Sequence, residues 1–103
     1  MGPTVASKLA DEVVFESPAL HTPQAGKTLT RKYLAAACNV LNNGSFRYVG
    51  EWSAAQSAVL EFKCRLGEVE VDGVDMISWN ADGLVTHFKV MIRPLKALQT
   101  LMP

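Results

Sequence analysis

The sequence predicts an α+β domain in which the helical segments come early and the β-strands come late. Three observations carry this prediction. Apolar side chains recur at helical spacing over residues 28–42, they alternate with more polar ones from Ser45 onward, and residues 80–83 have the composition of a hairpin loop. Because helices and strands do not alternate along the chain, we expect a mainly antiparallel sheet and not a parallel doubly wound one.

The first 42 residues predict a short helix, a strand and a longer helix. A helix of barely two turns is expected over residues 4–10, and a strand over residues 13–15. A loop over residues 18–26 leads to the helix at 28–42, which Thr28 is expected to cap. The apolar stripe of this helix consists of Leu29, Tyr33, Ala36, Ala37, Val40 and Leu41.

The rest of the chain predicts four antiparallel strands and a short helical tail. In the last two strands, both alternating sets of side chains contain apolar residues, so both faces of the sheet are expected to be covered. The long helix can cover one face, and a second copy of the chain is the natural cover for the other. The strands are expected near residues 46–52, 58–66, 69–79 and 84–95, and the tail over 96–102.

The composition fits one domain spanning residues 1–103. Hydrophobic residues make up 49% and charged residues 19%, which is the apolar end of the normal range for a globular chain. Lys+Arg and Asp+Glu both total 10, so no nucleic-acid partner is expected. The start of the chain does not resemble a signal peptide, and no apolar run approaches the ~20 residues of a membrane span. We therefore expect a cytoplasmic protein without membrane contact.

No cofactor and no metal site are expected. His21 and His87 are the two histidines, and Cys38 and Cys64 are isolated in the sequence. Zinc sites need about three or four such ligands from the protein, so these residues do not make one.

Three segments carry a family resemblance. The first runs from Val13 to Pro18 and continues through a loop to the helix that contains Tyr33, and the others are residues 71–85 and 88–95. In this order and spacing, they resemble SnoaL-like domains of the nuclear-transport-factor-2-like superfamily, whose relatives include ketosteroid isomerases, polyketide cyclases and limonene epoxide hydrolases. The resemblance covers the chain from about residue 8 to its end.

The resemblance implies a cone of strongly bent strands packed on helices that enclose a pocket. It also implies a homodimer formed through the convex face of the sheet, which would explain the doubly apolar strands. The sequence departs from the family at its start, where members usually have a long helix beside the pocket. Here that helix is absent or reduced, so the pocket is expected to be open or closed by a partner subunit.

Asp75 is the candidate catalytic residue. With a four-residue loop at 80–83, it is expected to pair with Phe88 and to share a face with apolar side chains, Ile77 among them. A carboxyl group in such surroundings is expected to have a raised pKa and could act as a proton donor or base. The resemblance also places Asp75 where ketosteroid isomerases hold a protonated aspartate as a hydrogen-bond donor. The alternative is a structural aspartate that binds a nearby amide or basic side chain.

Other candidate residues are expected to line the pocket. The aromatic ones could equally be plain core, and the loop histidine could be a solvated surface residue. Glu51 and Glu61 are further possible pocket carboxylates, but a slip of one residue in strand register would move each to the other face. The candidate ligand-binding residues are Tyr33, Tyr48, Trp52, Ile77, Trp79, Phe88 and His21.

Two classes of function follow from these residues. The first is a pocket that binds a small apolar ligand and could support simple proton transfer of the isomerase or cyclase kind. The second is a non-catalytic dimerisation or interaction module of the same fold. Steroid-isomerase chemistry is not expected, because the position of the isomerase base is occupied by Ser17 and the helix that carries the isomerase phenol is reduced. The segment from Leu84 to Pro103 also lacks the Asp or Glu that the cyclases use.

Overall fold

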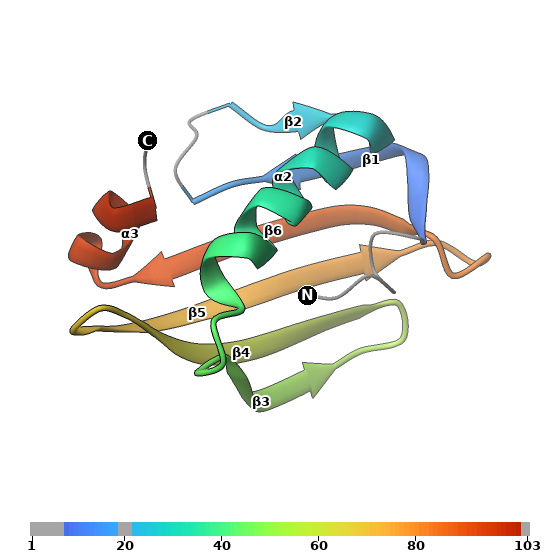
Figure 1. The fold of residues 1–103 in the computed structure, drawn as a ribbon. Helices are drawn as coiled ribbons and strands as arrows, with labels where there is room; N and C mark the ends of the chain where they lie inside the picture. Colours follow the sequence, from blue (N-terminus) through green and yellow to red (C-terminus); the bar gives the residue numbers. More distant parts are fainter. Residues whose placement is uncertain (1–7, 19–21, 102–103) are drawn as a thin grey trace.

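Six strands form one curved sheet, and a long helix lies across its concave face (Figure 1). The structure, a computed structural model, describes residues 8–18 and 22–101. The elements are β1 (Leu9–Glu16), β2 (Gln24–Ala25), α2 (Lys27–Leu41), β3 (Arg47–Ser53), β4 (Ser57–Leu66), β5 (Val69–Trp79), β6 (Val85–Arg93) and α3 (Leu95–Leu101).

The order of the strands in the sheet is β2-β1-β6-β5-β4-β3. Strands β3 to β6 are antiparallel neighbours, whereas β1 runs parallel to β6, so the sheet is mixed. The predicted α+β class and the curved sheet are therefore confirmed. The reversal between β5 and β6 is held by Asn80, whose Oδ1 accepts hydrogen bonds from the backbone N–H groups of Asp82 and Leu84, both at 3.0 Å.

The start of the chain differs from the prediction. Leu9 and Ala10 belong to β1, so the expected helix over residues 4–10 is wrong at its C-terminal end, and residues 1–7 lie outside the described part of the chain. Leu9 is buried and pairs with Val85 of β6. A two-turn helix has little stability of its own, so pairing with the sheet prevails over the local pattern.

The buried face of helix α2 differs in part from the predicted apolar stripe. Leu41 is buried and Tyr33 and Ala37 pack against the core, as predicted. Ala36 and Val40 of the stripe are exposed, however, and Thr30 and Leu34, which lie outside it, are buried against the sheet. The sheet receives the face with the larger leucine side chains, because they bury more apolar area than the alanines. The helix also begins directly after Gly26, with no side-chain cap, so the expected cap at Thr28 is wrong.

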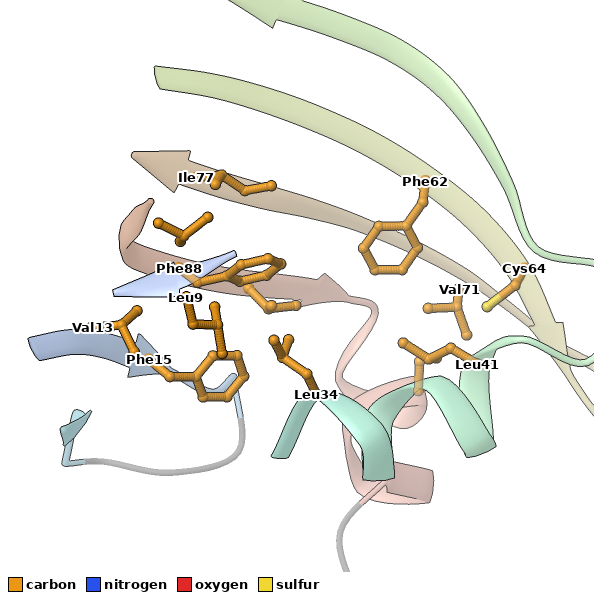
Figure 2. Packing of buried hydrophobic residues seen from close by; sticks show 13 residues of the cluster. Leu9, Val13, Phe15, Leu34, Leu41, Phe62, Cys64, Val71, Ile77 and Phe88 are labelled. Atoms are coloured by element: carbon orange, nitrogen blue, oxygen red, sulfur yellow. The ribbon is translucent and has the colours of Figure 1, made fainter. Parts of the chain in front are cut away.

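The core lies between α2 and the concave face of the sheet. Leu34 and Leu41 point from the helix toward side chains of the strands, among them Phe62, Val71 and Phe88 (Figure 2). Fully burying a side chain of this size contributes about 1.5–3 kcal/mol. The concave face is thus the face that carries Phe62 and Phe88, and the convex face is the opposite one.

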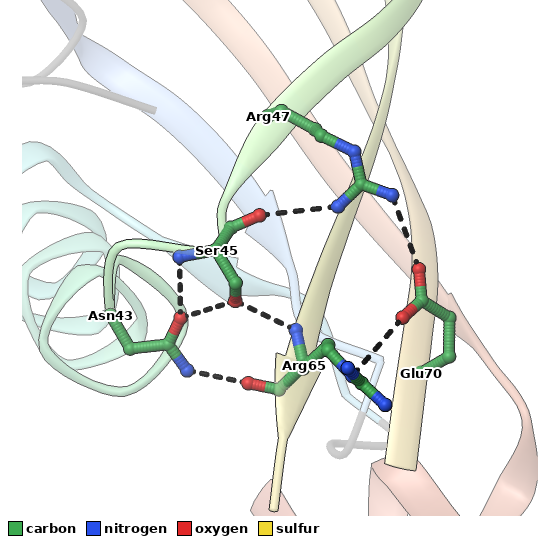
Figure 3. A network of polar contacts seen from close by, with 5 residues as sticks. All are labelled: Asn43, Ser45, Arg47, Arg65 and Glu70. Carbon is green, nitrogen blue, oxygen red and sulfur yellow. Dashed lines mark hydrogen bonds and ion pairs between the residues drawn. The ribbon is translucent and has the colours of Figure 1, made fainter. Parts of the chain in front are cut away.

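A polar network ties the end of α2 to the sheet (Figure 3). Asn43 donates from Nδ2 to the carbonyl of Arg65, and its Oδ1 accepts from the backbone N–H of Ser45 at 3.1 Å. Glu70 forms ion pairs with Arg47 at 3.3 Å and with Arg65 at 3.8 Å. These contacts fix where β3 begins relative to β4 and β5.

Candidate functional site

The register of β5 and β6 differs from the predicted one by two residues. Asp75 pairs with Val90 and not with Phe88, which pairs with Ile77. The turn closes between Asn80 and Leu84, whose backbone N–H and C=O are 2.9 Å apart, and a further register shift follows between Ser78 and Trp79. Because a shift of two residues preserves the faces of both strands, Asp75 still shares the concave face with Ile77 and Phe88.

Asp75 has no exposed surface. Its Oδ2 accepts a long hydrogen bond of 3.4 Å from the Tyr48 hydroxyl, and its Oδ1 has no hydrogen-bond partner among the described residues. Its neighbours across the sheet, Leu60 and Val90, are apolar. Burial raises the pKa of the Asp75 carboxyl to about 7, because a charged carboxylate is poorly solvated there.

Two aromatic groups lie on either side of Asp75. Within each group, neighbouring ring centroids lie 5.1 or 5.9 Å apart. The groups are Tyr48–Phe46–Phe62 and Tyr33–Phe15–Phe88. In the first group, Tyr48 donates to Asp75 and the ring of Phe62 covers Gly73. In the second group, Phe88 lies on β6, the strand beside Asp75, and pairs with Ile77. The surroundings of the carboxyl are therefore apolar and largely aromatic.

The structure brings most of the predicted ligand-binding residues to this side of the sheet. Ile77 and Phe88 are buried in the core beside Asp75, and Trp79 is half-buried farther along the same strand. Tyr33 reaches the cluster from α2. His21 lies outside the described residues. Their role in binding a ligand stays a prediction.

Trp52 is not brought to Asp75. It pairs with Val59, which pairs with Met76, and this row of side chains lies on the convex face. The indole folds back over Gly50, where a Cβ would lie 2.8 Å from Trp52 Cη2. Trp52 is 59% exposed.

The strand register places two glutamates, whose side of the sheet the sequence did not determine, on opposite faces. Glu51 pairs with Leu60, the neighbour of Asp75, so Glu51 lies on the concave face. Glu61 pairs with Val74 and lies on the convex face, where a hydrogen bond with Asp72 raises its pKa. The face of Glu51 depends on a register shift between Tyr48 and Gly50, for which the sequence has no signal beyond the glycine.

Thr30 is a further buried polar residue, which the sequence analysis missed. It has no exposed surface, and its Oγ1 has no hydrogen-bond partner among the described residues. It lies on the face of α2 that is buried against the sheet, at a position where the periodicity predicted no core residue.

A hollow of about 320 Å³ lies on the convex face and not beside Asp75. Its walls come from the middle of β4 and β5 and from the C-terminal end of β6. The predicted concave pocket is a different feature and stays a prediction. The hollow is lined by Glu61, Asp72, Gly73, Val74, Met91, Ile92 and Arg93.

Two further features concern metals and membranes. Within residues 8–18 and 22–101, no three His, Cys, Asp or Glu side chains gather in a way that could hold a metal ion. In the same part of the chain, no helix has the length and apolar character needed to cross a membrane.

Comparison with known proteins shows similarity to solved structures. No family model and no curated protein matches the chain. A steroid delta-isomerase from Pseudomonas aeruginosa is 37% identical, with a TM-score of 0.87, over 96% of this chain and 72% of the isomerase. A bacterial protein with a cystatin-like fold from Silicibacter pomeroyi is 31% identical, with a TM-score of 0.86, over 94% of this chain and 67% of its own.

A nuclear-transport-factor-2-like protein from Mesorhizobium loti shares the fold at lower identity. It is 15% identical, with a TM-score of 0.72, over 89% of this chain and 77% of its own.

Proposed function

The chain belongs to the nuclear-transport-factor-2-like superfamily, and we propose that its concave face binds a small apolar ketone, with the Asp75 carboxyl as the hydrogen-bond donor. The proposed chemistry is proton transfer next to the ketone group. The 37% identical protein from Pseudomonas aeruginosa, described as a steroid delta-isomerase, supports both an apolar substrate and this class of reaction.

The observation that carries the proposal is Oδ1 of Asp75, which is buried and has no hydrogen-bond partner within residues 8–18 and 22–101. A buried polar atom without a hydrogen-bond partner costs about 1–3 kcal/mol, and structures that keep one usually have a functional reason. With a pKa of about 7, the carboxyl is protonated in about half of the molecules at neutral pH. Its Oδ1 can then donate a hydrogen bond to the oxygen of a ketone.

The surroundings of Asp75 favour an apolar, ring-containing ligand. The neighbouring side chains are aromatic or aliphatic, and a single polar group among them would fix the orientation of the ligand. Tyr48 donates to Oδ2, which leaves Oδ1 as the oxygen that can donate to a ligand.

The experiment is a titration with a saturated steroid ketone, which can bind but cannot isomerise. Heat release or chemical-shift changes give the Kd for the wild type, Asp75→Asn and Asp75→Leu at several pH values. A hydrogen bond of about 1.4 kcal/mol corresponds to a tenfold loss of affinity in Asp75→Leu. Affinity of the wild type should weaken as the pH rises above about 7, whereas Asp75→Asn, which keeps an N–H donor, should show no such dependence.

The proposal would be refuted by a wild type that does not bind the ketone, or by Asp75→Leu binding as tightly as the wild type. Urea unfolding of each variant under the same conditions shows whether a loss of binding reflects a loss of folded protein.

A second candidate function is a homodimerisation module that uses the convex face. Trp52 and Met91 are 59% and 51% exposed there. Both lie on the face opposite the core, so a second copy of the chain could cover them. The exposed charges around them would then form a polar rim.

Sedimentation of the wild type, Met91→Asp and Val40→Asp tests this candidate. Val40 is 43% exposed on α2, away from the convex face, and serves as the matched control. We expect a dimer that Met91→Asp dissociates and Val40→Asp does not. A monomeric wild type at micromolar concentration would exclude the dimer. A stable dimer without ketone binding would favour the module over the ligand-binding function.

A further inference from the structure

The concave face carries a second carboxylate, and we propose that this residue, Glu51, is the base that moves the proton in the proposed reaction. The inference rests on the proposed function, which requires a base as well as the hydrogen-bond donor Asp75. The position at which the sequence resemblance placed a base is occupied by Ser17, so the base must come from elsewhere in the chain.

A β-bulge in β3 brings Glu51 to the concave face. Tyr48 pairs with Phe62, but the next residue has no partner, and the pairing resumes with Gly50 opposite Glu61. Without the extra residue, Gly50 would face Leu60 and Glu51 would point to the convex side. Bulges of this kind are common beside active sites, where they redirect a side chain.

The pairing places Glu51 and Asp75 in one row of the sheet. Glu51 pairs with Leu60 on β4, and Leu60 pairs with Asp75 on β5. Two strand spacings separate their Cα atoms by about 10 Å, and both side chains rise from the same face. A ketone group above Leu60 would therefore have one carboxyl group on each side.

Other acidic residues of the four antiparallel strands do not share this row. Glu61 and Val74 are paired, as are Glu70 and Arg65, and both pairs lie on the convex face with Asp72. Within β3 to β6, which the structure describes completely, Glu51 and Asp75 are thus the two carboxyl groups that the register places on the concave face.

The two carboxyl groups have different surroundings, as an acid and a base require. Asp75 is fully buried among apolar side chains, which favours its protonated form. Glu51 is exposed on the edge strand β3, and its Oε2 accepts a hydrogen bond of 3.3 Å from Ser53 Oγ. Contrasting environments of this kind assign the donor role to the buried group and the acceptor role to the exposed one.

The reaction moves one proton and consumes no other reagent. Glu51 takes a proton from the carbon between the ketone group and a β,γ double bond. The C–H electron pair forms a new C=C bond, and the ketone oxygen gains negative charge while Asp75 Oδ1–H donates a hydrogen bond to it. Glu51 then returns the proton to the γ carbon, which restores the C=O bond and leaves a conjugated ketone.

The experiment uses a steroid ketone with a β,γ double bond, whose conjugated product is followed by its ultraviolet absorbance. The variants are Glu51→Gln and the matched control Glu61→Gln on the opposite face. A general base contributes about 100-fold or more to the rate, so Glu51→Gln should lower kcat by at least that factor with little change in ketone affinity. Glu61→Gln should stay within about twofold of the wild type, since surface substitutions away from a site have small effects.

The possible results distinguish a failure of the role of Glu51 from a failure of the proposed function. If the wild type binds the saturated ketone through Asp75 but Glu51→Gln retains full turnover, Glu51 is not the base and the proposed function stands. If the wild type binds the saturated ketone but does not isomerise the unsaturated one, the role of Glu51 and the proposed proton transfer both fail, and only the binding of the ketone stands. If the wild type does not bind the ketone at all, the proposed function fails and the role of Glu51 fails with it.

Discussion

Replacing Asp75 with asparagine should change the way in which the free energy of unfolding depends on pH. Burial raises the pKa of this carboxyl from its ordinary value of 3.8 to about 7 in the folded protein. Between these values the folded protein holds a proton that the unfolded chain has released, so the stability falls as the pH rises. The stabilising contribution is complete below pH 3.8 and is lost as the pH passes about 7.

The magnitude follows from the difference between the two pKa values. About three pKa units, at roughly 1.4 kcal/mol each, correspond to about 4 kcal/mol between acidic and mildly alkaline solution. This is a large share of the roughly 5–15 kcal/mol that stabilises a small domain. Asparagine has nearly the same shape and does not titrate, so the variant should lack this contribution.

The assay is urea unfolding of the wild type and Asp75→Asn from about pH 4 to about pH 8, at one protomer concentration, followed by tryptophan fluorescence. Subtracting the two curves removes the contributions of the other titrating groups to the pH dependence of the free energy of unfolding. Glu61 is one of them, and its pKa is raised through its hydrogen bond with Asp72. The difference should change by about 4 kcal/mol in favour of the variant as the pH rises. Parallel curves would show that the pKa of Asp75 is not raised in the folded protein and would refute the reasoning.

Two further substitutions test the packing and the end of α2. Gly73→Ala should destabilise the protein by about 1–3 kcal/mol, because overpacking a buried site forces its neighbours to move. Its Cβ would lie 2.4 Å from Phe62 Cζ, so an unchanged urea midpoint would show that the ring is free to shift. Asn43→Ala should cost about 1–2 kcal/mol, because it removes the hydrogen bonds to Ser45 and to the carbonyl of Arg65. Asn43→Asp, which keeps only the acceptor, should lose part of this energy, and equal stability of all three proteins would contradict the network.

The site was predictable in part because side-chain alternation survives some errors of register. The predicted pairing of Asp75 was wrong by two residues, yet the face of Asp75 was right, since only an odd shift moves a side chain to the other face. Trp52 and Glu51 show the opposite case. A single extra residue in β3 sends Trp52 to the convex face and Glu51 to the concave face.

The sequence by itself determined the α+β class, the long helix and the tight reversal at Asn80. These depend on side chains that are close together in the chain, where spacing and turn chemistry act directly. The tertiary structure decided which side of α2 is buried, that Leu9 joins the sheet beside Val85, and which carboxyl groups share a face. Those features depend on contacts between segments that are distant in the chain. In β3, one unpaired residue is enough to move the following side chains to the other face of the sheet.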